Sequence, residues 1–372
     1  MRLTHPGGST VHLAYCTNVH AAEDLAGVVG QLDRFAVPVR EELGVDLLGL
    51  GLWLAEPVAS ALAADRGLRL GLRRELAARG LEAVTLNGFP YQAFQAPVVK
   101  HDVYYPDWTD RRRLRYTLEL AAILADLLPD GAERGSISTL PLAWREPWTS
   151  DNADSARKLL SELSGGLAGY GGRIRVAFEP EPGCVVETTT QAVTALSDVD
   201  TDYLGVCLDL AHLACAWEDP AQAVARLDAA GIPIVKVQVS AALEIADPAA
   251  NLDTLAEYAE PRFLHQTRSA AGAAFDDLPE ALASGAPGPW RIHFHAPLHA
   301  APLPPLTTSV PVLRQALAVL MESPACDHLE VETYTWGVLP DAARPVDDAG
   351  LARGIAAELA FARDELHALG VS

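Results

Sequence analysis

Short runs of apolar residues recur along the chain, and the spacing between them leaves room for a helix. Each run is bounded by turn-forming residues and therefore predicts a strand. The runs lie at 11–18, 46–54, 81–89, 136–144, 174–182, 204–212, 234–242 and 328–336, with one additional run at 290–299. Because the runs are nearly continuous rather than alternating, they are typical of a parallel sheet that is covered on both faces.

The segments between the runs predict helices with recognisable ends. These segments lie at 57–80, 110–129, 151–167, 219–231 and 349–370. In the fourth segment, Pro220 stands at the first helical position and Gly231 follows the last turn, which are the positions that these residues favour. Asp151 or Asn152 is the expected N-cap of the third helix.

This order of strands and helices predicts an α/β fold. A chain of 372 residues with this many strand–helix units fits one (β/α)8 TIM barrel. The alternative is a doubly wound open sheet, but the first turn, at 17–24, lacks a glycine-rich phosphate loop. We therefore expect a single barrel domain over 1–372, with a strand and loop segment inserted between strands seven and eight. The Pro-, Gly- and Ala-rich stretch 268–290 is predicted to be a surface loop.

Composition and charge narrow the classes of function. The chain is 49% hydrophobic and 21% charged, which is typical of a globular protein. Its formal charge of −21 argues against a nucleic acid partner, because phosphate binding needs a concentrated basic surface. The dense basic cluster at 110–115 opens a predicted helix, so we interpret it as a solvated face.

The cysteines and the apolar stretches bear on location. Five cysteines are scattered without a C-x-x-C pair, as expected for reduced, buried thiols. The longest apolar stretch, 45–58, carries Asp46 and Glu56 and is too short to span a membrane. The first ten residues lack the apolar run of a signal peptide. We therefore expect a cytoplasmic protein, and a homodimer is compatible with these features.

Polar side chains gather at the predicted C-terminal ends of strands five to eight, where a barrel places its catalytic groups. They are Glu179 and Glu181 after strand five, Asp209 and His212 after strand six, Gln238 in strand seven, His293, His295 and His299 in the inserted run, and Glu330 and Glu332 in strand eight. Several carboxylates at one mouth would repel one another without a cation. The pattern therefore predicts a divalent metal ion, namely Mn²⁺, Co²⁺, Zn²⁺ or Mg²⁺. Such an ion could hold two vicinal oxygens of a polyol or hydroxy-ketone while a carboxylate removes a carbon-bound proton.

Each of these residues also has a structural interpretation. Asp209 could cap the turn that follows it, and the carboxylates of 179–181 could face water. His293 and His295 share one face of a strand and could be ordinary buried histidines. The metal site is favoured because the polar groups coincide at neighbouring strand ends.

The order of these residues resembles the xylose-isomerase-like barrel superfamily, which includes sugar isomerases, ketose 3-epimerases and endonuclease IV. A narrower set of motifs is similar to the EboE family, which is encoded in a bacterial gene cluster linked to metabolite traffic. These motifs include "TLNGFPYQAF", "VKHDVYYPDWTDRRRLRYT", "FEPEPG", "CLDLAH", "VKVQVSAAL", "HFHAPL" and "LEVETYTW". The resemblance implies one isomerase-like barrel that handles a small secondary metabolite or its precursor.

The superfamily resemblance also implies roles for individual residues. Glu179 corresponds to the metal-binding Glu of strand five, with Glu181 as the alternative, and Asp209 corresponds to the ligand of strand six. Glu332 corresponds to the carboxylate of strand eight, and His212 to a histidine that contacts substrate. In epimerases the carboxylates of strands five and eight also exchange the substrate proton, so Glu179 and Glu332 are the expected catalytic pair.

The chain departs from the superfamily pattern at strand seven. Epimerases commonly place a metal-binding His there, whereas this chain has Gln238, whose oxygen is a weaker ligand. His295 or His265 could take its place. If neither does, the barrel could bind or carry a small metabolite without turnover. The chain is therefore expected to be either a metal-dependent isomerase or epimerase of a sugar, cyclitol or related polyol, or a catalytically inactive carrier. Endonuclease activity ranks third because of the acidic charge.

Further residues are candidates for contact with the substrate. They are Asn87, Tyr91, Lys100, Lys236, His265, His293 and Trp336. Asn87 could equally form a turn with the glycine that follows it, and Tyr91 could serve only in packing. Lys236 lies inside strand seven and needs a partner, for which Glu179 and Asp209 are the expected choices.

Overall fold

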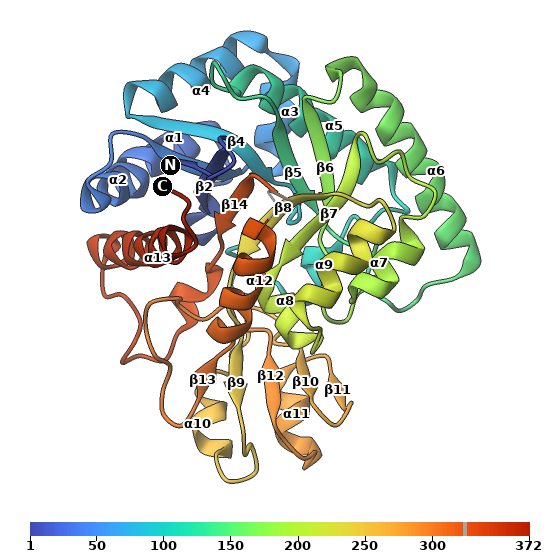
Figure 1. The fold of residues 1–372 in the computed structure, drawn as a ribbon, viewed down its shortest axis with the longest axis vertical. Coiled ribbons are helices and arrows are strands. Elements are labelled where there is room, and N and C mark those ends of the chain that lie inside the picture. Colours follow the sequence, from blue (N-terminus) through green and yellow to red (C-terminus); the bar gives the residue numbers. More distant parts are fainter. Residues whose placement is uncertain (323–325) are drawn as a thin grey trace.

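The computed structural model describes residues 1–322 and 326–372. Parallel strands close into an eight-stranded barrel, as the sequence predicted (Figure 1). The barrel strands are β2 (Thr10–Cys16), β3 (Leu48–Trp53), β4 (Leu81–Asn87), β5 (Gly135–Thr139), β6 (Ile174–Phe178), β7 (Leu204–Asp209), β8 (Ile234–Val239) and β14 (His328–Val331). Parallel pairing of β2 with β3 closes the ring. The short β1 (Arg2–Thr4) adds to β2 in the antiparallel direction.

Helices surround the barrel. They are α1 (Leu25–Gln31), α2 (Val37–Leu43), α3 (Glu56–Ala64), α4 (Arg66–Ala78), α5 (Arg111–Leu127), α6 (Ser150–Leu167), α7 (Thr189–Ala195), α8 (Leu210–Cys215), α9 (Pro220–Ala229), α12 (Val310–Glu322) and α13 (Asp348–Ala368). Single turns or irregular helical segments are η1 (Thr17–His20), η2 (Leu32–Ala36), η3 (Lys100–Tyr104), η4 (Ala168–Tyr170) and η5 (Tyr334–Val338). Among the described residues, no helix is both long and apolar enough to cross a bilayer.

The helix ends agree with the sequence in some places and differ in others. Asp219 caps α9 with Pro220 at its first position, as expected. The predicted N-caps of α6, Asp151 and Asn152, are wrong. The hydroxyl of Thr149 caps this helix by accepting from the Asn152 amide, and the side-chain oxygen of Asn152 accepts from the Thr149 amide. The segment 57–80 forms two helices rather than one because the Asp65 carboxylate accepts from the first amides of α4 and starts a new helix.

A second sheet is inserted between β8 and β14. Its strands are β9 (Leu243–Ile245), β10 (Thr267–Ser269), β11 (Ala274–Phe275), β12 (Trp290–Ile292) and β13 (Thr307–Thr308), in the order β11-β10-β12-β9-β13. Its helices are α10 (Leu252–Ala256) and α11 (Leu278–Ser284). The insertion was predicted, but the expectation that 268–290 is a surface loop is wrong. This stretch contains β11 and α11, and strands this short carry no periodic signal.

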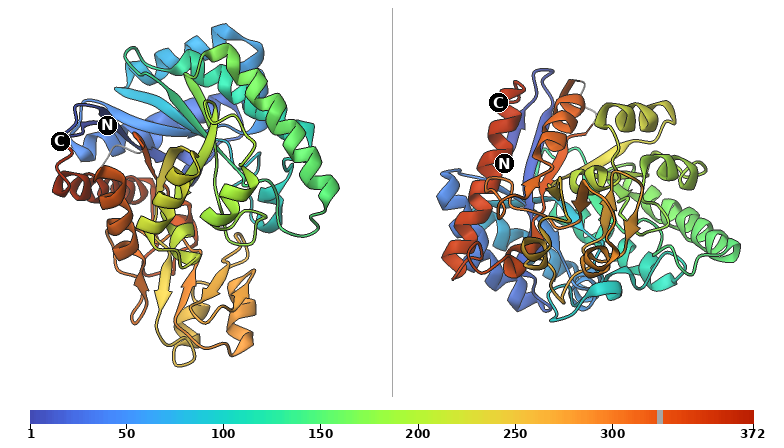
Figure 2. Two further views of the ribbon diagram at one scale, coloured as in Figure 1. Left: turned by 45° about the vertical axis from the view of Figure 1, so that its right-hand side comes forward. Right: turned by 90° about the horizontal axis from the view of Figure 1, so that it is seen from below.

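The inserted sheet lies at the end of the barrel toward which β8 runs (Figures 1 and 2). It has its own apolar core, in which Leu243, Tyr258, Trp290 and Phe294 are buried. Since β9 begins four residues after β8 ends, the insert covers the C-terminal mouth of the barrel. This placement brings the residues after β12 over the strand ends.

The cysteines follow the sequence prediction. All five are free thiols and all are buried. Their surroundings are apolar or acidic, and burial raises the pKa of each thiol above its usual value. They are therefore inert core residues rather than reactive groups.

Candidate metal and active site

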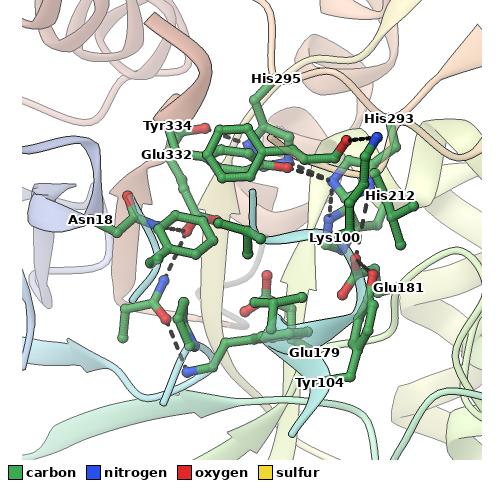
Figure 3. Close-up of a pocket in the computed structure, with 18 residues that line it drawn as sticks. Asn18, Lys100, Tyr104, Glu179, Glu181, His212, His293, His295, Glu332 and Tyr334 are labelled. Carbon is green, nitrogen blue, oxygen red and sulfur yellow. Dashed lines mark hydrogen bonds and ion pairs between the residues drawn. The ribbon is translucent and has the colours of Figure 1, made fainter. Parts of the chain in front are cut away.

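Three carboxylates lie at the C-terminal ends of neighbouring barrel strands. Asp209 is the last residue of β7, Glu179 follows β6 directly, and Glu332 follows β14 directly. All three are buried, with exposed fractions of 3% for Glu179, 1% for Asp209 and 5% for Glu332. The rule that places functional groups at the strand ends of a barrel therefore brings these three side chains to one mouth, where Figure 3 shows Glu179 and Glu332.

Three histidines meet above these carboxylates. His212 comes from α8, whereas His293 and His295 follow β12 of the insert. The Nε2 atom of His293 lies 2.9 Å from Nε2 of His212 and 3.2 Å from Nε2 of His295. All three rings are buried. The barrel and the insert thus supply one cluster of imidazoles (Figure 3).

The hydrogen bonds of the opposite ring nitrogens define the tautomer of each histidine. Nδ1 of His212 donates to the carbonyl oxygen of Pro180 at 2.9 Å, and Nδ1 of His295 donates to that of Glu332 at 2.7 Å. Nδ1 of His293 donates to the side-chain oxygen of Gln266 at 2.7 Å. Oxygens of this kind only accept, so each Nδ1 carries the proton.

Burial keeps these rings neutral. It lowers the pKa of His212 to about 4 and also lowers the pKa of His293 and of His295. With Nδ1 protonated and the ring uncharged, each Nε2 presents a lone pair. The Nε2 lone pair of His293 therefore lies about 3 Å from those of His212 and His295, an arrangement that a bound cation would stabilise.

Asp209 completes the group of donor atoms. Its Oδ2 lies 3.7 Å from Nε2 of His295, and its Oδ1 lies 3.8 Å from Nε2 of His212. Oδ1 accepts from the His212 amide and from the Ser240 hydroxyl, each at 2.8 Å. Oδ2 has no hydrogen-bond partner within 1–322 and 326–372. Asp209 thus caps the following turn with Oδ1, as its structural interpretation expected, and places Oδ2 beside His295.

This donor set fits a divalent metal ion. Ligand atoms of His212, His293 and His295 lie within 4.8 Å of one another, as do those of Glu179, Asp209 and His212 and those of Asp209, His295 and Glu332. An unpartnered carboxylate oxygen and three converging imidazole lone pairs are costly without a cation. Three nitrogens and one oxygen are the donors that Zn²⁺ and Co²⁺ prefer, whereas Mg²⁺ prefers oxygen alone.

Glu332 and Glu179 differ in their surroundings. Oε1 of Glu332 accepts from the side-chain amides of Asn18 at 2.7 Å and Asn87 at 2.8 Å. Oε2 of Glu179 is buried and unpartnered in the described part of the chain. Burial raises the pKa of Glu332 to about 8, and it raises the pKa of Glu179 well above its usual range, with the charges of Glu332 and Asp209 adding to the effect. The two carboxyl groups therefore favour a state in which one of them holds a proton.

Glu181 belongs to the hydrogen-bond network that holds His293 rather than to the groups of possible metal ligands. Its Oε1 accepts from the Tyr104 hydroxyl at 2.7 Å and from the Gln266 amide at 3.3 Å. Gln266 in turn accepts from His293. Among the described residues, Glu181 joins none of the metal-compatible groups. Of the two carboxylates that the sequence left as alternatives, the geometry favours Glu179 as the one nearer the cluster.

The strand-seven position carries Gln238, whose side-chain amide is buried inside the barrel. Gln238 is fully buried, and neither atom of its amide has a partner in the ranges that the structure covers. His295 lies beside Asp209, where it can replace the missing strand-seven ligand. His265 does not reach the cluster because its Nε2 pairs with Glu260 at 2.9 Å and its Nδ1 donates to the His293 carbonyl.

The expected partners of Lys236 are wrong. Its ammonium forms an ion pair with Glu330 at 2.5 Å, and both side chains are fully buried. Lys236 is in register with Cys207, and Gln238 is in register with Asp209. Lys236 therefore lies two residues deeper in the barrel than Asp209, in the layer that Glu330 reaches from β14.

Besides Lys236 and His265, two more of the expected substrate contacts lie outside the cavity lining. Tyr91 packs against the Tyr116 ring at 5.1 Å, and the indole of Trp336 donates to Glu358 at 3.0 Å. Asn87, Lys100 and His293 do line the cavity above the strand ends, which has about 50 Å³ of space open to water-sized molecules.

The sequence analysis missed several residues of this site. Asn18 donates to Glu332, and Ser240 donates to Asp209. The Tyr334 hydroxyl lies 3.3 Å from Nε2 of His293. Ser240 lies two residues after Gln238, so the period of a strand would have placed it on the same side. Tyr104 and Gln266 had no local signal, because their contacts depend on long-range folding.

No protein-family model matches the chain, and no curated protein matches it. Solved structures do resemble it. A D-allulose 3-epimerase from Methylomonas sp. superposes with a TM-score of 0.55 at 13% identity, covering 97% of this chain and 99% of that one. A protein of Anabaena variabilis described as a sugar phosphate isomerase/epimerase gives 0.54 at 16% identity, covering 97% and 100%. A xylose isomerase domain protein from Alicyclobacillus acidocaldarius gives 0.51 at 15% identity, covering 94% and 97%. The chain therefore has the fold of the xylose-isomerase-like (β/α)8 barrels.

Proposed function

We propose that this protein is a metal-dependent isomerase or epimerase that acts on a sugar, cyclitol or related polyol. The observation that carries the proposal is the convergence of His212, His293, His295 and Asp209 beside the buried carboxyl groups of Glu179 and Glu332. The names of the structural neighbours, which include a D-allulose 3-epimerase and an L-ribulose 3-epimerase, support the same reaction class. The resemblance of the sequence motifs to the EboE family supports a substrate from secondary metabolism.

In this proposal His212, His293, His295 and Asp209 hold the metal ion, and Glu332 and Glu179 lie next to it. When bound, the ion would act as a Lewis acid toward two vicinal oxygens of the substrate. Relative to the sequence prediction, Asp209 and His295 keep their role as ligands, and His212 and His293 join them. Gln238 and Glu181 are then not ligands, and Glu179 and Glu332 act as the acid and base rather than as the main ligands.

Glu179 and Glu332 are the proposed acid and base. An ionised Glu179 can accept a proton from a substrate carbon at its unpartnered Oε2 while Glu332 holds a proton. The electron pair of the broken C–H bond moves toward the neighbouring carbonyl, and return of a proton from Glu332 to the other face inverts the carbon. The reverse assignment performs the reverse reaction. Because the two buried carboxyl groups favour one shared proton, they are matched to this exchange.

The side chains around the pair fix its geometry. Asn18 and Asn87 hold Oε1 of Glu332. The buried walls exclude bulk water, which would otherwise exchange the shared proton. Since the ligands come from both the barrel and the insert, we also propose that residues 1–372 act as one domain. Five free cysteines support a reducing, cytoplasmic location.

Binding without turnover is the second candidate function. The observation that favours it is Gln238, a weak ligand at the position where the superfamily carries a histidine. A carrier of this kind would retain the cavity and the side-chain amides of Asn18 and Asn87 that line it. It would not move a proton at carbon.

Hydrogen exchange at carbon tests the proposal. The metal-replete protein would be incubated in D₂O with ketoses, an inosose and aryl hydroxy-ketones, and deuterium at carbon would be followed by NMR. We expect incorporation into at least one compound, and a loss of about a hundredfold or more in Glu179→Gln and in Glu332→Gln. Glu244→Gln, an acidic position on the surface of the insert, is the matched control. Metal-bound protein that labels none of the compounds would contradict turnover and favour the carrier.

A further inference from the structure

The cavity above the strand ends has two chemically different sides. Its floor is acidic and imidazole-rich, as described above. Its cover comes from the segment between β4 and α5 and from the segment of the insert before β10. The two cover segments are joined, because the amides of Val99 and Lys100 donate to the Arg262 carbonyl at 2.7 and 2.9 Å.

The cover is apolar and aromatic where it faces the cavity. Phe94 and Phe263 line it, and their ring centroids lie 5.3 Å apart. Tyr334 packs on both, at 5.3 Å from Phe94 and 4.9 Å from Phe263. Phe89, Val99 and Leu264 line the same cavity. Because the Tyr334 hydroxyl also reaches His293, the aromatic surface begins directly at the imidazole cluster.

Among the described residues, no Lys or Arg side chain with an unpaired charge faces this cavity. Lys100 is the one Lys or Arg among its described lining residues. Its ammonium donates to Asp277 at 2.5 Å, to the Phe263 carbonyl at 2.6 Å and to the Glu260 carbonyl at 3.2 Å, so all three of its protons are used. Glu179, Glu181 and Glu332 line the same space. A phosphate or carboxylate on the ligand would meet this acidic field without a side-chain partner.

A bare sugar also fits this cavity poorly. A ketohexose carries an oxygen on every carbon, and each oxygen that is buried without a hydrogen bond is costly. The floor offers donors and acceptors, but the rings of Phe94 and Phe263 offer neither. A ligand that satisfies both sides presents its oxygens to the floor and an apolar group to the cover.

We propose that the substrate is an uncharged polyol or hydroxy-ketone that carries an aromatic or comparable flat apolar substituent. The hydroxyl and carbonyl groups of this substrate rest on the proposed function. Its apolar substituent is inferred from the residues of the cover, and its lack of negative charge is inferred from the paired state of Lys100. The site therefore differs in specificity from one that binds a sugar phosphate.

Binding of three matched probes tests this inference. The full-length, metal-replete protein would be titrated calorimetrically with 2-hydroxyacetophenone, dihydroxyacetone and dihydroxyacetone phosphate. We expect the aryl probe to bind about tenfold or more tightly than dihydroxyacetone, because burial of the ring adds apolar contact. The phosphate is expected to bind no more tightly than dihydroxyacetone. Tightest binding of the phosphate, or equal binding of the aryl probe and dihydroxyacetone, would overturn the proposal.

Two variants locate the effect at the cover. Phe94→Ser is expected to remove most of the preference for the aryl probe. Val99→Thr is nearly isosteric and adds a hydroxyl, so it should weaken aryl binding several-fold with little risk to folding. Phe275→Leu, in the insert but outside the cavity lining, is the control and should leave all three affinities unchanged. An aryl preference that survives both cover variants would overturn the assignment.

The binding measurements and the deuterium-exchange experiment can fail independently of each other. Selective aryl binding without any deuterium exchange at carbon would support the ligand class and reject turnover. Deuterium exchange together with preference for the phosphate would support turnover and reject the ligand class.

Discussion

His212 and His293 lie 81 positions apart in the chain, yet their Nε2 atoms are 2.9 Å apart. One ring belongs to the barrel and the other to the inserted sheet. Both rings donate from Nδ1 to oxygens, so neither Nε2 has a proton to offer the other. A cation between the insert and the barrel, as in the proposed function, would stabilise this contact.

The Ser240 hydroxyl should tune the affinity of the metal site. It donates to Oδ1 of Asp209 at 2.8 Å and accepts from the Ala211 amide at 2.9 Å. Ser240→Ala removes the group that orients Asp209, and changes of this kind typically lower metal affinity about tenfold to a hundredfold. Competition with a chromophoric chelator measures the effect. Ser309→Ala is the matched control, since its hydroxyl is equally buried and, among the described residues, accepts only from the Ala242 amide. Equal affinities in the two variants would contradict the role of Ser240.

The buried ion pair of Lys236 and Glu330 should matter for folding more than for chemistry. Removal of either partner leaves a fully buried charge, so Lys236→Met and Glu330→Gln are each expected to lower the free energy of unfolding by about 3–5 kcal/mol. The double variant should lose less than the sum of the two. Urea unfolding of all four proteins measures the coupling. Additive losses would show that the pair is not coupled.

Glu358 should make stability depend on pH. It lies in α13 and accepts from the Thr333 hydroxyl at 2.6 Å and from the Leu298 amide at 3.0 Å, which anchors the segment after Glu332. Burial raises its pKa from 4.5 to about 7. The folded state therefore binds this proton more tightly than the unfolded state, so its contribution is complete below pH 4.5 and is lost as the pH rises to about 7.

The variant Glu358→Gln isolates this contribution. In the natural chain the group should lower the free energy of unfolding by roughly 3 kcal/mol between pH 4.5 and 7. The variant should show a smaller fall over the same interval, whatever its absolute stability. Urea unfolding at several pH values gives the two slopes. Identical slopes would mean that Glu358 titrates normally in the folded protein.

The barrel and its carboxylates could be predicted because both follow from local rules. Near-continuous apolar runs predicted the parallel strands, and the rule that strand ends meet at one mouth placed Glu179, Asp209 and Glu332 together. The predicted partners of Lys236 were wrong because residues two positions apart on a strand lie in different layers of the barrel interior. The predicted partners come from the ends of β6 and β7, whereas the observed partner, Glu330, lies on β14 in register with Gln238 and reaches Lys236 with its side chain.

The insert could not be predicted at the same level. Its strands are only two or three residues long, and they pair with segments that are distant in sequence, so no periodic pattern marked them. His293 was therefore assigned to substrate binding, and His295 was only one of two replacements for the strand-seven ligand. Only the folded insert shows that His293 contacts both His212 and His295.

Metal content tests the central claim most directly. The protein would be purified without a chelator or a metal-affinity tag, and its metals measured by mass spectrometry for the natural chain, His293→Gln and His299→Gln. His299 belongs to the same inserted run but stacks on Trp336 away from the cluster. We predict about one equivalent of a divalent metal in the natural chain and in His299→Gln, and a large loss in His293→Gln. Natural protein that stays metal-free after reconstitution, or metal content unchanged in His293→Gln, would contradict the claim that the insert and the barrel together hold a metal ion.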